Sequence, residues 1–257
     1  MNLRIGIAAC VVRSIEILPI ARYAGFDFLL ADMEHGPLSL AEAAALCVAG
    51  READFLVFVR APGARATDIP RIVDCGARGI VVPHVDSVED AQAIVDQTRF
   101  PPLGRRSIPY PVAATGFRPV SPAEIVARSE DGFELFLMIE SREGLDACEA
   151  IAALDGVDGL VIGANDLTQA LGRAGDLDAR EAREAFRRVA DAALGSGKIF
   201  GVMGVPDAFI HSHAVDLGAT WTLAANDVNL LFEAAEARAQ AIRALCGPRS
   251  EIRSGAR

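Results

Sequence analysis

Two acidic residues stand near the ends of apolar runs that are typical of buried strands. Glu140 closes the run Glu134–Glu140, and Asp166 comes shortly after the run Gly159–Gly163. A carboxylate is costly to bury unless a partner balances its charge, and a divalent cation is the usual partner. Asp166 alone would be interpreted as a helix N-cap. The pair, completed by substrate oxygens and water, instead predicts a metal site.

A histidine and a further carboxylate follow another apolar run. Asp32 lies near the end of the run Phe26–Met33, and His35 comes just after it. His35 could act as a general base near neutral pH, with the Asp32 carboxylate holding its tautomer. The alternative is a loop histidine beside acids that cap a helix, but the place at a strand end favours catalysis. His84, near the end of the run Gly79–Val85, is a weaker candidate base.

Arg60 and the segment Gly163–Asp166 complete the candidate residues. Arg60 stands near the end of the run Phe55–Ala61. A cation there could hold a carboxylate or a developing enolate oxygen, although a salt bridge at the rim of the fold explains it equally well. Gly163–Asp166 predicts a strand that turns into a helix, whose first N–H groups suit an anion such as a substrate carboxylate.

Strand-like and helical segments alternate along the chain, which predicts parallel βαβ units. Eight such units in 257 residues predict a single-domain α/β (β/α)8 barrel, a TIM barrel. A doubly wound sheet is the alternative, weakened in its dinucleotide-binding form because no GxGxxG follows the first run. The strand-like runs are Leu3–Ala9, Phe26–Met33, Phe55–Ala61, Gly79–Val85, Glu134–Glu140, Gly159–Gly163, Lys198–Met203 and Ala219–Ala224. Alanine-rich helical stretches include Ser39–Ala49, Ser87–Gln97, Arg142–Leu154 and Arg180–Leu194.

In such a barrel the C-terminal ends of all strands meet at one mouth, where barrel enzymes place their chemistry. We expect the barrel to occupy residues 1–246 and residues 247–257 to form a flexible tail. The segment Phe100–Pro119 is rich in proline and glycine and carries Arg105, Arg106 and Arg118. A long loop of this kind is usually functional, and we expect it to lie over the mouth.

Composition excludes several classes of function. The net charge of −10 argues against nucleic acid, and no apolar run approaches the roughly 20 residues of a membrane span. Five scattered cysteines suit a reducing, cytoplasmic location without disulfides. Lys198, the only lysine, is expected at the N-terminal face of the barrel, which makes it a poor Schiff-base candidate. His211 and His213 are expected at the surface, because residues two apart on a helix point to different faces.

Taken together and in this order, the motifs resemble the HpcH/HpaI aldolase family, class II metal-dependent pyruvate aldolases of the phosphoenolpyruvate/pyruvate barrel superfamily. The resemblance extends from about Leu3 to Leu231. Departures include Met33, where the family often has glycine, and Ala164-Asn165, where Pro-Ala is common. The matching stretches are Phe26–His35, Val59–Arg60, Asp74–Pro83, Thr98–Pro102, Met138–Glu143 and Gly156–Leu167.

The resemblance implies a role for each candidate residue. Glu140 and Asp166 would bind a divalent metal ion, Mg²⁺, Mn²⁺ or Co²⁺. His35, oriented by Asp32, would be the acid/base. Arg60 would hold the pyruvate keto oxygen and stabilise the enolate. Glu34 would hydrogen-bond water at the metal, and the segment formed by Gly163, Ala164, Asn165 and Asp166 would bind the pyruvate carboxylate.

The implied activity is cleavage, and the reverse formation, of 4-hydroxy-2-oxo acids to pyruvate and an aldehyde. Alternatives on the same barrel are an acyl-CoA lyase of the citrate-lyase β type or a 2-oxo acid decarboxylase; a non-catalytic binding barrel is a further one. The family often forms hexamers with exchanged C-terminal helices. The stretch Val228–Ala241 is compatible with such a homo-oligomer but could equally pack on its own barrel.

Overall fold

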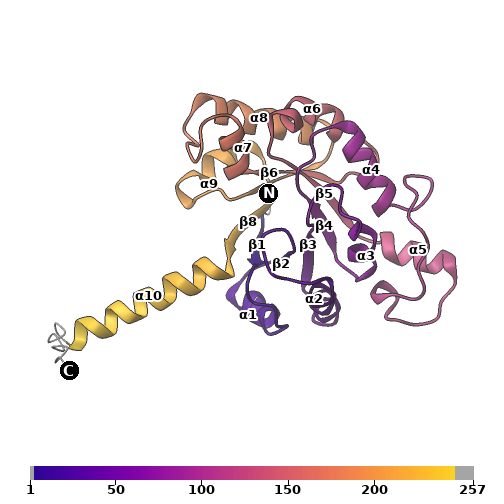
Figure 1. The fold of residues 1–257 in the computed structure, drawn as a ribbon, viewed down its shortest axis with the longest axis horizontal. Coiled ribbons are helices and arrows are strands. Elements are labelled where there is room, and N and C mark those ends of the chain that lie inside the picture. Colours follow the sequence, from indigo (N-terminus) through magenta and orange to yellow (C-terminus); the bar gives the residue numbers. More distant parts are fainter. Residues whose placement is uncertain (1–2, 247–257) are drawn as a thin grey trace, which may run out of the picture.

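Eight parallel strands close into a barrel in the computed structural model, which describes residues 3–246 (Figure 1). Each strand overlaps one of the eight apolar runs, and neighbouring strands follow chain order, with β8 pairing with β1. The (β/α)8 prediction is therefore confirmed. The strands are β1 Arg4–Ala9, β2 Phe28–Asp32, β3 Leu56–Arg60, β4 Gly79–Val82, β5 Glu134–Ile139, β6 Gly159–Gly163, β7 Ile199–Met203 and β8 Trp221–Asn226.

Helices follow the strands, and serine caps begin several of them. The side chains of Ser39, Ser87 and Ser141 each accept the N–H of the third helical residue, which fixes where α2, α4 and α6 begin. The four predicted helical stretches are confirmed as α2, α4, α6 and α8. The helices are α1 Ile17–Ala24, α2 Leu40–Glu52, α3 Ile69–Asp74, α4 Val88–Thr98, α5 Pro122–Glu130, α6 Arg142–Ala152, α7 Ala164–Ala170, α8 Arg180–Gly195, α9 Asp207–His213 and α10 Asp227–Cys246, with short 3₁₀ turns η1 Ala113–Thr115 and η2 Val215–Leu217.

Aromatic side chains fill the interior of the barrel. Phe28 stacks on Trp221 with ring centroids 4.6 Å apart, and Phe58 stacks on Phe136 at 5.6 Å. Glycine at position 6 makes room for this layer, because a Cβ there would lie 2.0 Å from the Phe28 ring. A second, larger core lies between the strands and the surrounding helices. The barrel is thus a packed scaffold that holds its strand ends in place.

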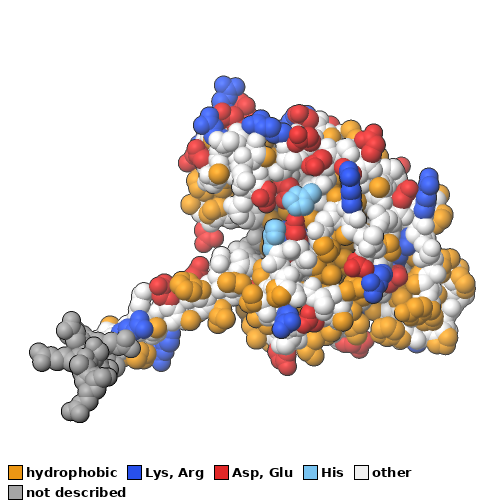
Figure 2. Space-filling view, in the orientation of Figure 1, with side chains coloured by type: hydrophobic (Ala, Val, Ile, Leu, Met, Phe, Trp, Pro, Cys, Tyr) orange, Lys and Arg blue, Asp and Glu red, His pale blue; other side chains and the backbone are white. Residues whose placement is uncertain are grey.

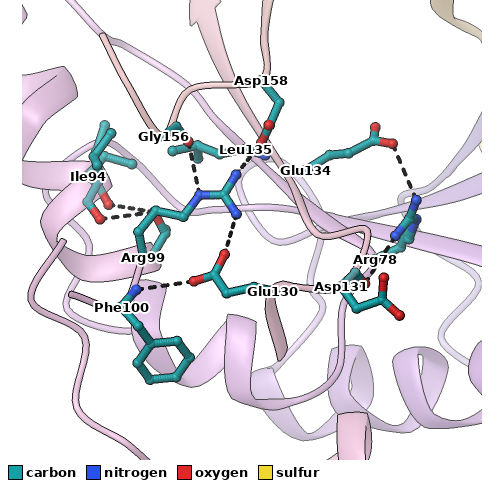
Figure 3. Close-up of polar contacts among 12 residues, drawn as sticks. Arg78, Ile94, Arg99, Phe100, Glu130, Asp131, Glu134, Leu135, Gly156 and Asp158 are labelled. Carbon is teal, nitrogen blue, oxygen red and sulfur yellow. Dashed lines mark hydrogen bonds and ion pairs between the residues drawn. The ribbon is translucent and has the colours of Figure 1, made fainter. Parts of the chain in front are cut away.

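The segment Phe100–Pro119 lies at the opposite end of the barrel from the mouth. It follows α4, so it leaves the barrel where the strands begin. Arg99, just before it, donates to Glu130 (Nη1–Oε2 2.6 Å) and to the Gly156 carbonyl (3.0 Å), and pairs with Asp158 next to the start of β6 (Figure 3). The prediction that this segment covers the mouth is therefore wrong, because a loop after a helix returns the chain to the N-terminal end.

Arg106 anchors this segment to the neighbouring helix α3. Its side chain is buried, donates to Asp74 Oδ1 at 2.5 Å and lies over the Phe100 ring at 4.6 Å. The arginine therefore ties the segment to the end of α3. It lies at the N-terminal end of the barrel, so it cannot attract a substrate to the mouth.

α10 leaves the barrel. It begins against β8 and β1 and then extends away from the other helices (Figure 1). Several apolar side chains along it are exposed, including Leu231 (64%) and Phe232 (65%). The expected tail, residues 247–257, lies outside the described residues. No helix within residues 3–246 is both long and apolar enough to cross a membrane.

Candidate active site

A cavity of about 750 Å³ opens at the C-terminal ends of the strands. Figure 2 shows histidine side chains and carboxylates gathered around a hollow on this face. The cavity brings together most of the residues singled out in the sequence. The predicted residues that line it are Asp32, His35, Arg60, Gly163, Ala164, Asn165 and Asp166.

Arg60 is held by two carboxylates at the bottom of this cavity. Asp32 and Arg60 are paired in the register of β2 and β3. Arg60 Nε donates to Asp32 Oδ1 at 2.9 Å and Nη2 donates to Oδ2 at 2.5 Å, while Nη1 lies 3.0 Å from Glu34 Oε2. This two-pronged contact fixes the guanidinium plane and leaves one N–H on each terminal nitrogen for a ligand.

The pair keeps both charges at neutral pH. Burial disfavours the Asp32 carboxylate, but hydrogen bonds from Arg60 and from the backbone of Glu34 and His35 outweigh it and lower the pKa of Asp32. Burial likewise disfavours the Arg60 cation, yet the Asp32 hydrogen bond and charge raise the pKa of Arg60. The cavity therefore contains one fixed positive charge on a rigid side chain.

His35 lies at the rim with its imidazole 65% exposed. Its Nε2 is 3.8 Å from Glu34 Oε2, and its backbone N–H points to Asp32 Oδ1 at 3.4 Å. The structure thus brings His35 and Asp32 together through the backbone, while the Asp32 carboxylate is occupied by Arg60. The carboxylate nearest to the imidazole is Glu34.

Glu140 is buried beneath the rim. Its Oε1 accepts the His84 backbone N–H at 2.7 Å and lies 3.1 Å from His84 Nδ1. Its Oε2 lies against Gly163, where an added Cβ would approach it to 2.5 Å. Burial raises the pKa of Glu140; His84 opposes this, and the neighbouring charges of Glu34 and Asp166 add to it. The carboxylate thus lacks a full counter-charge.

Asp166 stands in the first turn of α7 and is exposed to the cavity. Its charge is close enough to Glu140 to disfavour ionisation there. Among residues 3–246, no three His, Cys, Asp or Glu side chains are grouped to hold a metal ion by themselves. Two oxygen donors with unbalanced charge, and a glycine that leaves space beside one of them, fit a hard cation that takes its other ligands from substrate and water.

Sequence reasoning missed Asp227, which holds the loop after β1 that carries the cavity-lining residue Cys10. This buried residue begins α10, and its carboxylate accepts the N–H groups of Cys10, Val11 and Val12 at 3.0, 2.9 and 2.6 Å. The signal was present, because Asn226-Asp227 closes β8 much as Asn165-Asp166 follows β6. Asp227 thereby joins the loop after β1 to α10.

The two histidines of α9 and the cysteine in the cavity have no role in the candidate site. His213 was expected at the surface but is buried, with Nε2 2.9 Å from the Leu177 carbonyl and its ring edge-on to Phe186. His211 is exposed as expected. Cys10 lines the cavity, but burial and the Asp32 charge raise the pKa of its thiol to about 12, so it is no nucleophile at neutral pH.

A parallel eight-stranded barrel with carboxylates, an arginine and a histidine at its C-terminal mouth defines a (β/α)8 enzyme. Comparison with known proteins narrows this class. The family model described as HpcH/HpaI aldolase/citrate lyase matches residues 12–242. The chain therefore belongs to the HpcH/HpaI aldolase/citrate lyase family.

Individual relatives agree with this membership. The chain is 36% identical over 224 residues to a 4-hydroxy-4-methyl-2-oxoglutarate aldolase of Hapsidospora irregularis, covering 84% of this chain and 81% of the relative. It is 30% identical over 223 residues to a 5-keto-4-deoxy-D-glucarate aldolase of Escherichia coli, covering 87% and 85%. The crystal structure of an HpcH/HpaI aldolase from Desulfitobacterium hafniense superposes with a TM-score of 0.86 at 29% identity, covering 94% and 93%. The chain is a carbon–carbon lyase of the aldolase type.

Proposed function

We propose that this aldolase cleaves 4-hydroxy-2-oxo acids to pyruvate and an aldehyde, and catalyses the reverse addition. The observation that carries the proposal is that Arg60 and Asp166 line one cavity at the strand ends, while the buried Glu140 lies against Gly163 of the same cavity and close to Asp166. A 2-oxo acid offers adjacent carboxylate and keto oxygens, which suit a fixed cation beside an oxygen-ligated metal site. The aldolase names of the relatives support the same substrate class.

Glu140 and Asp166 would hold Mg²⁺, Mn²⁺ or Co²⁺. When bound, the ion supplies Lewis-acid stabilisation of the negative charge that develops on the keto oxygen as the bond breaks. Glu140 would offer its Oε2 to the ion, since its Oε1 already accepts the His84 backbone N–H. Gly163 is suited to this place because any larger residue would collide with that oxygen.

Arg60 and the backbone at the start of α7 bind the substrate. Arg60 donates its free N–H groups to the keto oxygen and stays oriented because Asp32 holds its other face. The backbone N–H groups of Gly163, Ala164, Asn165 and Asp166, at the start of α7, receive the substrate carboxylate.

His35 takes the proton of the C4 hydroxyl as the C3–C4 bond breaks. The aldehyde leaves, the electrons of the C3–C4 bond form the pyruvate enolate, and C3 then takes one proton, which balances the one that His35 took, to complete the methyl group of pyruvate. Glu34 Oε2, 3.8 Å from His35 Nε2, is the carboxylate that faces this imidazole. His35 thus serves as base in cleavage and as acid in the reverse addition.

The test is pyruvate release from a panel of 4-hydroxy-2-oxo acids, with acyl-CoA thioesters of 3-hydroxy and 3-oxo acids as the rival panel. Release of pyruvate with no thioester cleavage supports the proposal. Thioester cleavage without pyruvate contradicts it and assigns the chain to the citrate-lyase branch of the family.

We further propose that the chain works as a homo-oligomer. α10 exposes Leu231, Phe232, Ile242 and Leu245 to solvent along a helix that extends away from its own barrel. Such a row of apolar side chains is costly in water, and a second copy of this chain would bury it. The hexamer implied by the family resemblance is one assembly that would do so.

We also propose a cytoplasmic location. The four cysteines whose side chains are described, Cys10, Cys47, Cys75 and Cys148, are all free thiols. Unpaired thiols of this number suit a reducing compartment.

A further inference from the structure

His84 occupies an unusual place beside the candidate metal site. It follows β4 at the mouth of the barrel and has a φ of 56°, in the left-handed region that few residues other than glycine adopt. Histidine tolerates this conformation better than most side chains. Residues held in such conformations cluster at functional sites, where the surrounding contacts maintain them.

The contacts of His84 explain the conformation. Its backbone N–H donates to Glu140 Oε1 at 2.7 Å. Its imidazole lies between two buried carboxylates, with Nδ1 3.1 Å from Glu140 Oε1 and Nε2 2.7 Å from Glu34 Oε1. The ring of His84 thus contacts both carboxylates, and its backbone N–H contacts Glu140 as well.

We propose that His84 is a positioning residue that orients Glu140 for the cation and links it to Glu34. This inference rests on the proposed function. His84 engages Glu140 Oε1 twice, so this oxygen is occupied and only Oε2, on the Gly163 side, is free to bind an ion. Partners of this kind, which hold a metal-binding carboxylate in one rotamer, tune metal affinity without touching the metal.

The same contacts exclude His84 as the general base. Both ring nitrogens are within 3.1 Å of carboxylate oxygens, so neither is free to take a proton from a substrate hydroxyl. His35 keeps that role, because the described contacts of its ring are limited to Glu34 at 3.8 Å.

The test is Mn²⁺ binding to the full-length protein, measured by calorimetry and by the electron paramagnetic resonance signal of free Mn²⁺. His84→Gly removes the ring but keeps the backbone N–H and the positive φ. His84→Asn keeps a short amide donor near Glu140 and also tolerates the left-handed region, but it cannot reach Glu34. His211→Ala, in an exposed histidine of α9, is the matched control, and thermal unfolding monitors folding of every variant.

We expect the Mn²⁺ dissociation constant to rise about tenfold to a hundredfold in His84→Gly, with His84→Asn between this variant and the wild type. His211→Ala should bind as the wild type does. Equal Mn²⁺ affinity of His84→Gly and wild type would overturn the positioning role and leave the proposed function intact. Absence of Mn²⁺ binding by the wild type would instead overturn the metal site, and this inference with it.

Discussion

At the scale of single residues, the Asp32–Arg60 pair organises the mouth. Arg60 is 12% exposed and Asp32 only 1%, so the pair is largely shielded from solvent. A shielded pair holds its geometry firmly but depends on both partners, because removing one leaves an unbalanced buried charge. The orientation of Arg60 and the charge of Asp32 can therefore be tested separately.

Arg60→Lys keeps the positive charge but loses the flat fork that faces Asp32 and the substrate. We expect kcat for pyruvate release to fall on the order of a hundredfold, because donors aimed at the developing oxyanion contribute about this much. Steady-state kinetics measure the change. Arg105→Lys, in an exposed arginine at the far end of the barrel, should leave kcat unaltered. Equal kcat for Arg60→Lys and wild type would remove Arg60 from the reaction.

The pKa of Asp32 is lowered in the folded protein, which links the pair to acid stability. Its contribution is fully present above the unfolded pKa of about 3.9 and is lost as the pH falls through the lower folded value. Asp32→Asn should therefore lower the unfolding free energy by about 3–5 kcal/mol near neutral pH. Denaturant unfolding at a series of pH values should show this deficit shrinking in acid.

Asp191→Asn, in an exposed aspartate of α8, is the control for that series and should follow the wild type throughout. A deficit for Asp32→Asn that stays constant down to pH values well below the unfolded pKa would show that the Asp32 charge is not what stabilises the pair.

Residue-scale features differ in how far the sequence predicted them. Arg60, Glu140 and Asp166 could be placed because each stands near the end of an apolar run, and parallel strands bring such ends together. The contact of Asp32 with Arg60 could not, because it depends on the register between β2 and β3. The contact of His84 with Glu140 depends on a left-handed backbone conformation at His84, which the residue type does not predict.

At the scale of elements, close packing inside the barrel fixes the positions of the strand ends. Aromatic residues on some strands face glycines on their neighbours, so the rings that fill the interior have room to stack. Overpacking such a layer forces side chains out of their preferred rotamers. The mouth therefore depends on small residues deep in the barrel.

Gly6→Ala tests this packing. The new Cβ would lie 2.0 Å from the Phe28 ring, so we expect a loss of about 1–3 kcal/mol in unfolding free energy. Gly195→Ala is the control, because that glycine in α8 has no atom within 4 Å of an added Cβ and alanine favours helix. Denaturant unfolding distinguishes them, and equal stability of both variants would contradict the account of the interior.

Elements were predicted well where apolar runs have clear ends, and less well at the connections. The segment Phe100–Pro119 was assigned to the wrong end because its composition looked functional, whereas the chain order strand, helix, loop already requires the N-terminal end. His213 was misplaced because helix geometry alone does not reveal that Leu177 and Phe186 cover it.

At the scale of the whole molecule, α10 is the feature that a single barrel does not explain. Phe232→Glu places a charge in its exposed apolar row, and we expect the proposed homo-oligomer to shift towards smaller species, since each buried large side chain contributes about 1.5–3 kcal/mol. Light scattering after size exclusion measures the mass. Val215→Glu, in an exposed apolar residue of η2, should leave it unchanged. A monomeric wild type would refute the proposal.

The central claim is that the mouth of the barrel is a metal site formed by Glu140 and Asp166. The most direct measurement is pyruvate release by wild type and Glu140→Gln after EDTA treatment and again after adding Mg²⁺, Mn²⁺ or Co²⁺. We predict that wild-type turnover is lost with EDTA and returns with metal, while Glu140→Gln stays inactive at metal concentrations that saturate the wild type. Turnover that survives EDTA, or a Glu140→Gln variant as active as the wild type, would contradict the account.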